Sequence, residues 1–76
     1  MKAIDTQALG KHMAAVRKAH GLSQKQLEQE ADIANNTVSR YETGHTLPCL
    51  YNLLLICCAL GITLDEYIGE IPVVEM

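Results

Sequence analysis

Five polar side chains between residues 35 and 43 carry hydrogen-bonding groups that suit a flat polar ligand. If this segment is helical, their spacings of one, three, four and five residues place them on one stripe, which contains no acid. Asn can hydrogen-bond two positions on an adenine edge and Arg two on a guanine edge, while Ser and Thr reach bases or phosphates. The five are Asn35, Asn36, Ser39, Arg40 and Thr43. Taken alone, such a stripe is more typical of an ordinary solvated helix face, because short motifs often match by chance.

The residues before this stripe predict a short helix with a well-defined start. Ser23 is a favourable N-cap, and Gln26, three residues later, can return a hydrogen bond to the Ser23 backbone. Leu22 and Leu27 occupy the two positions that pack together around such a cap. A helix is therefore expected from about Ser23 to Ala31.

A turn and a second helix are expected next. Asp32 is predicted to make the turn, because aspartate tolerates the left-handed backbone conformation better than most residues with a side chain. Ile33, Val38 and Tyr41 supply apolar anchors for the second helix, and Gly44 can end it. The polar stripe would then lie on the outer face of this second helix.

Three more helices are predicted around this pair. The first runs from a cap at Asp5 or Thr6 to about His20. The next spans about 49–60, and the last begins at Thr63, where Glu66 can complete a second capping box. The apolar face of the first helix consists of Leu9, Met13 and Val16.

Length and composition predict one small all-α domain. A chain of 76 residues buries only about 60–65% of its unfolded surface. No run of about 20 apolar residues or signal peptide is present, so we expect a cytoplasmic protein without a membrane span. We predict a single domain over residues 1–76, with a core at 6–69 and a short, partly apolar tail at 70–76.

Catalytic and metal chemistry have little support in the sequence. The cysteines, which are odd in number, lack metal-site spacing and are expected to be reduced thiols. We expect the histidines at the surface or in loops, and we predict no catalytic residue, metal, cofactor or small-molecule ligand. These residues are Cys49, Cys57, Cys58, His12, His20 and His45. The adjacent pair Cys57 and Cys58 leaves a redox or metal sensor open, although helical cysteines on apolar faces are more often core residues.

The charge of the chain is unevenly distributed along the sequence. Residues 1–40 hold all six Lys and Arg residues and four acids, a net charge of +2. Residues 41–76 hold no Lys or Arg and five acids, a net charge of −5, which gives the total of −3. The positive part contains most of the polar stripe, and the negative part can face away from an anionic ligand. Phosphate contacts would still be few, so nucleic-acid binding would be modest and rely on dimerisation.

An ordered set of residues runs from about residue 8 to residue 68. It consists of Leu9-Gly10, Arg17, Gly21-Leu22-Ser23-Gln24, Leu27, Thr37-Val38-Ser39-Arg40-Tyr41-Glu42, Gly44, Pro48, Leu50, Leu53, Ile56, Ala59-Leu60-Gly61-Ile62 and Leu64-Asp65-Glu66. This set resembles the lambda-repressor-like, Cro/cI-type helix-turn-helix family, and as a whole it is far more specific than any one dipeptide in it.

The resemblance implies a compact five-helix domain that binds double-stranded DNA, mostly as a dimeric transcription regulator. It implies that Gln24 begins the first motif helix against the DNA backbone and that Asn35, Asn36 and Arg40 enter the major groove. It also implies that Arg17 pairs with Glu42 beneath the second motif helix. The loop after the second helix would run along the backbone, and Lys25 is a further candidate phosphate contact. The predicted DNA-contacting residues are Gln24, Lys25, Asn35, Asn36, Thr37, Ser39, Arg40, Thr43, His45 and Thr46.

Three positions depart from the family pattern. Glu28 stands where the family usually has Ala, at the close approach of the two motif helices, and argues against tight packing there. Asp32 replaces the usual turn Gly. Ala34 stands where a Ser or Thr normally caps the second helix, so the cap is expected to move to Asn35.

The helix at 49–60 is apolar on nearly all sides, which predicts burial on all sides. By resemblance, its inward positions are Leu50, Leu53, Ile56, Cys57 and Leu60. Its second stripe, predicted as a dimer interface, is Tyr51, Leu54, Leu55 and Cys58. The alternative is that Ile71, Val73 and Val74 of the tail cover this stripe within one chain.

Two functions remain open from the sequence. The first is a sequence-specific double-stranded DNA-binding transcription regulator, a repressor by preference, that acts as a homodimer on a palindromic operator. The second is a protein-interaction module on the same fold, antitoxin-like or an anti-repressor partner, with weak or no DNA binding. The polar stripe and the charge distribution favour the first; the acidic total and Glu28 favour the second.

Overall fold

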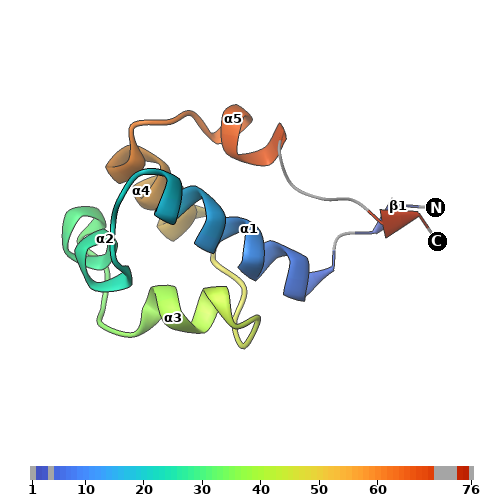
Figure 1. The fold of residues 1–76 in the computed structure, drawn as a ribbon, viewed down its shortest axis with the longest axis horizontal. Helices are drawn as coiled ribbons and strands as arrows, with labels where there is room; N and C mark the ends of the chain where they lie inside the picture. Colours follow the sequence, from blue (N-terminus) through green and yellow to red (C-terminus); the bar gives the residue numbers. More distant parts are fainter. Residues whose placement is uncertain (1, 4, 70–73, 76) are drawn as a thin grey trace.

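The structure, a computed structural model, describes residues 2–3, 5–69 and 74–75. These residues form helices α1 (Thr6–Ala19), α2 (Gln24–Ala31), α3 (Thr37–Glu42), α4 (Leu50–Leu60) and α5 (Leu64–Gly69). Two short strands, β1 (Lys2–Ala3) and β2 (Val74–Glu75), pair antiparallel beside the chain ends (Figure 1). The all-α fold class is confirmed. In the predicted tail, Val74 pairs with Ala3, whereas Ile71 and Val73 lie outside the described residues.

The starts of α1, α2 and α5 follow the capping signals of the sequence. The Asp5 side chain caps α1. Ser23 and Gln26 form the predicted reciprocal capping box at α2. At α5, the Glu66 N–H donates to the Thr63 hydroxyl, and the Glu66 carboxylate accepts from the Thr63 N–H. Each cap satisfies backbone N–H groups that a helix leaves without a partner in its first turn.

The hydrophobic core receives side chains from every helix. Figure 1 shows α1 between α3 and α5, with α2 beyond the turn that ends α1 and α4 overlapping the end of α1 in this view. The buried apolar residues are Met13, Val16, Leu27, Ala31, Val38, Tyr41, Ile56, Cys57, Leu60 and Tyr67. In the part of the chain that is described, no helix is long and apolar enough to cross a membrane.

His12 differs from its predicted surface position. It is 8% exposed, and its Nε2–H donates to the Tyr67 carbonyl oxygen at 2.8 Å. The two rings also pack at a centroid distance of 4.6 Å. Burial raises the pKa of the Tyr67 phenol to about 12. His12 therefore attaches α5 to α1, a role that a search for metal-ligand spacing does not detect.

Two positions of α4 also differ from the prediction. Leu50, expected in the core, is 64% exposed, because it is the first residue of the helix and lies beyond the packed surface. Leu55, expected on the outer stripe, is half-buried and packs against the core. The exposed side of α4 therefore combines Leu50 with Tyr51, Leu54 and Cys58.

Gly10 allows α1 to approach the backbone of α3 closely. A Cβ atom at this position would lie 2.9 Å from the Tyr41 carbonyl oxygen and would overlap the Glu42 carbonyl group. Real Cβ atoms do not come this close to a backbone oxygen, so only glycine fits without a shift of one helix. The backbone contact fixes the distance between α1 and the C-terminal end of α3.

We therefore expect Gly10→Ala to destabilise the protein, although alanine favours helix formation over glycine. The free energy of unfolding, measured by denaturant titration, should fall by about 1–3 kcal/mol, the usual range for overpacking. Lys11→Ala, on the exposed side of α1, is the control and should change it by less than about 0.5 kcal/mol. A Gly10→Ala protein as stable as the parent would contradict the close approach.

Candidate nucleic-acid interface

A tight turn joins α2 to α3 and needs left-handed backbone at both of its ends. Asp32, which ends α2, has φ 57° and ψ 47°, so its predicted role in the turn is confirmed. Asn36, which precedes α3, has φ 69°. Asp and Asn adopt this conformation more readily than other residues with a side chain. The residue types at these two positions therefore permit a turn without glycine.

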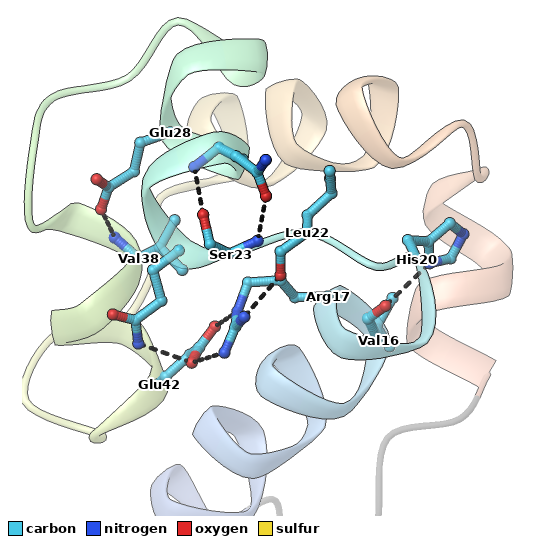
Figure 2. Close-up of polar contacts among 10 residues, drawn as sticks. Val16, Arg17, His20, Leu22, Ser23, Glu28, Val38 and Glu42 are labelled. Carbon is cyan, nitrogen blue, oxygen red and sulfur yellow. Dashed lines mark hydrogen bonds and ion pairs between the residues drawn. The ribbon is translucent and has the colours of Figure 1, made fainter.

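The start of α3 is capped differently from the prediction. The N-cap is Asn36 rather than Asn35, and its side chain makes no capping hydrogen bond. Instead, Oε2 of Glu28 accepts a hydrogen bond from the Val38 N–H at 2.9 Å (Figure 2). Glu28 is only 4% exposed, so the expectation that it argues against tight packing is wrong. The sequence held one signal for this cap: Ala34 lacks the usual capping hydroxyl, and an acid is present on the preceding helix.

A buried carboxylate connects α3 to α1 and α2. Glu42 accepts hydrogen bonds from Nε of Arg17 at 2.6 Å and from Nη2 at 3.0 Å. The Gln24 amide donates to the same carboxylate at 3.0 Å, and Nη1 of Arg17 donates to the Leu22 carbonyl at 2.7 Å. Figure 2 shows the Arg17 guanidinium between the Glu42 carboxylate and the Leu22 carbonyl. This is the pair that the family resemblance implies.

The electrostatics of this pair favour the charged form of Arg17. The side chains of Arg17 and Glu42 are 10% and 7% exposed, so the two charges are largely removed from water. The hydrogen bond to Glu42 raises the pKa of Arg17, and the negative charge of Glu42 adds to the effect. The two-point contact with a planar guanidinium fixes an angle as well as a distance. The same carboxylate holds the Gln24 side chain at the first turn of α2.

Most of the predicted contact residues surround two polar hollows beside α3. The hollow between α2 and the start of α3 is lined by Gln24, Lys25, Glu28, Asn35, Asn36 and Ser39. The other is lined by Thr37, Arg40, Tyr41, Thr46 and Asn52. Asn35, Asn36 and Arg40 are exposed, so their amide and guanidinium groups are open to a ligand.

Two predicted contacts lie at the end of α3, outside these hollows. The Thr43 hydroxyl donates to the Arg40 carbonyl at 3.2 Å, and the His45 N–H donates to the same carbonyl at 3.0 Å. Both residues therefore bond to the last turn of α3, and both are exposed to solvent. Asn52 was not predicted as a contact residue, yet its amide donates to the Tyr41 hydroxyl at 2.9 Å and thereby joins α4 to the second hollow.

The buried pair gives a direct test of the scaffold. Glu42→Ala leaves the Arg17 charge without its partner, which typically costs about 3–5 kcal/mol. We expect a clear fall in melting temperature, measured by circular dichroism. Glu66→Ala, which removes an exposed acid and its capping bond to the Thr63 N–H, is the control and should lower the melting temperature less. A melting temperature equal to that of the parent would mean that the pair contributes nothing to stability.

Comparison with known proteins agrees with this geometry. The family model HTH_3, described as helix-turn-helix, matches residues 13–67. The crystal structure of the restriction-modification controller protein C.AhdI from Aeromonas hydrophila superposes with a TM-score of 0.78 and 30% identity, over 83% of this chain and 96% of that one.

Two curated relatives are longer than this chain. The cryptic phage CTXphi transcriptional repressor RstR of Vibrio cholerae is 38% identical over 58 residues, 76% of this chain and 52% of the repressor. The antitoxin PezA of Streptococcus pneumoniae is 29% identical over 62 residues, 82% of this chain and 39% of the antitoxin. This chain thus spans about half or less of their length. The family match covers most of the chain, and the chain belongs to the helix-turn-helix family HTH_3, as the Cro/cI-type resemblance predicted.

Proposed function

We propose that this protein is a sequence-specific double-stranded DNA-binding transcription regulator that reads base edges from the turn before α3 and from α3 itself. The observation that carries the proposal is the exposed set Asn35, Asn36 and Arg40 above the buried Arg17–Glu42 pair. Amide and guanidinium groups can each make two hydrogen bonds to one base, and this pairing discriminates between bases only when the side chains are held in register. RstR, a relative, is named as a transcriptional repressor, which supports repression here.

The charge distribution supports the same surface. Lys25 and Arg40 line the two hollows beside α3, while residues 41–76 contain no Lys or Arg. Phosphate neutralisation releases counterions, and affinity falls with salt in proportion to the number of contacts. With so few cations, the affinity of one subunit would be modest, so selectivity would depend on base contacts and on a second subunit.

Base readout and phosphate contact predict different responses to substitution. Asn36→Ala and Arg40→Ala should each cost about 1–3 kcal/mol on the preferred duplex and relax selectivity at particular positions. Lys25→Ala should weaken all duplexes alike and reduce the salt dependence, because it removes a phosphate contact. The preferred duplex is first selected from a random pool with the parent protein. Anisotropy titrations across a salt series then measure the affinity of each variant for this duplex and for others. Equal, sequence-blind losses for all three variants would contradict direct readout.

Dimerisation is the second part of the proposal, and the exposed apolar side of α4 supports it. A contiguous apolar surface on a soluble domain commonly marks an interaction site. The exposed apolar residues in and before α4 are Leu47, Leu50, Tyr51 and Leu54, with Cys58 on the same side of the helix. Leu55, half-buried against the core, would contribute less. A two-fold interface through α4 would present two α3 helices to half-sites about one helical turn apart, which requires a palindromic operator.

A protein-interaction module is the competing function, and the same apolar surface bears on it. PezA, a relative, is named as an antitoxin, and a different protein could occupy the α4 surface in place of a second copy. The two functions differ in what they require of the purified protein. A DNA-binding homodimer self-associates without any partner and prefers one duplex. A pure interaction module neither self-associates through α4 nor prefers one duplex over another.

Leu54→Glu tests the interface, because it introduces a charge into the 41% exposed Leu54 position without disturbing a fully buried side chain. Sedimentation equilibrium should show a dimer for the parent and a folded monomer for the variant, with weaker binding to the preferred duplex. Ala15→Glu, at an exposed position of α1, is the matched control and should remain dimeric. A dimer that survives Leu54→Glu would move the interface away from α4.

A further inference from the structure

The Glu28 carboxylate occupies an unusual position for an acid in a DNA-binding motif. It belongs to α2, yet its side chain lines the same hollow as Asn35, Asn36 and Ser39. Its Oε2 atom accepts the Val38 N–H at 2.9 Å, and the residue is 4% exposed. A buried acid without hydrogen bonds would be strongly destabilising, so the bond to Val38 is the contact that accounts for its position.

Glu28 holds both ends of the turn that carries the exposed asparagines. Its backbone carbonyl accepts the Ile33 N–H at 3.0 Å, at the end of α2. Its side chain holds Val38, the second residue of α3. One residue thus fixes the path of the chain where it leaves α2 and where it enters α3. The residues between these two points include Asn35 and Asn36.

Few other hydrogen bonds define the start of α3. The Asn36 side chain makes no capping bond, and the Thr37 N–H has only a 3.3 Å contact with the Ala34 carbonyl. A six-residue helix is too short to be stable by itself, so its first turn depends on outside partners.

We infer that Glu28 is a positioning residue for base readout: it sets the orientation of Asn35, Asn36 and the first turn of α3 by holding the Val38 amide. The inference rests on the proposed DNA binding, and it assigns part of the selectivity to a side chain that does not contact the DNA. Loss of the Glu28 acceptor should reduce preference for the correct duplex more than it reduces affinity for DNA in general.

Three variants separate the hydrogen bond from the charge. Glu28→Met keeps a long side chain but has no strong acceptor. Glu28→Gln loses the charge and retains a carbonyl oxygen that can accept the Val38 N–H. Glu30→Gln removes an exposed acid from the same helix and controls for the change in net charge. Far-UV circular dichroism at the temperature of the binding experiments establishes that each variant is folded.

Two measurements on these proteins test the inference. Hydrogen exchange of the Val38 amide, followed by NMR in the free protein, reports whether Glu28 holds the start of α3. The ratio of affinities for the selected duplex and a scrambled duplex reports selectivity. In Glu28→Met we expect faster Val38 exchange and a ratio about tenfold lower, which corresponds to about 1.4 kcal/mol. In Glu28→Gln and Glu30→Gln both quantities should stay close to those of the parent.

The outcomes distinguish this inference from the proposed function. Faster Val38 exchange in Glu28→Met with an unchanged affinity ratio would overturn the inference, since Glu28 would then act on stability alone. Unchanged exchange would overturn it as well. If the parent protein prefers no duplex over a scrambled one, the proposed function fails, and the assignment of selectivity to Glu28 fails with it. In that case faster exchange in Glu28→Met would still establish that Glu28 holds the start of α3.

Discussion

The Glu42 carboxylate is the group on which the arrangement of the first three helices depends. It lies at the C-terminal end of α3, and it accepts hydrogen bonds from Arg17 of α1 and Gln24 of α2. A largely buried carboxylate needs a cation and several donors to offset its lost hydration, so neither helix can rotate away without leaving that charge unsatisfied. Gly10 adds a steric condition at the same place, because the absence of a side chain lets α1 contact the backbone of Glu42. Attraction and close approach together set the angle of α3.

Two acids of the motif explain how an acidic chain can present the surface that we propose to bind DNA. Glu28 and Glu42 both lie in the motif, yet both direct their oxygens to donors within the protein. Among the described side chains, no buried nitrogen or oxygen atom lacks a hydrogen-bond partner. The negative charges are therefore used to hold the helix, whereas the exposed groups around the hollows are amides, hydroxyls and the cations Lys25 and Arg40. The net charge of −3 is consequently a poor guide to this surface.

The sequence predicted the features that depend on neighbouring residues and missed those that depend on distant ones. The capping box joins Ser23 and Gln26, which are three positions apart, and the left-handed turn depends on Asp32 alone. The residue types are therefore sufficient to predict both features. His12 bonds to a carbonyl 55 residues away, and Glu28 to an amide ten residues away, across a turn whose geometry no local pattern specifies. The pair Arg17 and Glu42 was accessible only through the family resemblance, since their 25-residue separation carries no periodic signal.

A helix of six residues makes few hydrogen bonds of its own, so the orientation of α3 has to be imposed from both ends. Glu28 holds its second residue from α2, and Glu42, its last residue, is held from α1 and α2. Restraint at one end would leave the helix free to swing about that point. Restraint at two points, separated by nearly the whole length of the helix, removes this freedom and leaves only rotation about its own axis. That rotation is opposed by Val38 and Tyr41, which are buried on the inner face. The exposed side chains of α3 therefore owe their alignment to two carboxylates and two apolar anchors, all four held by contacts within the protein.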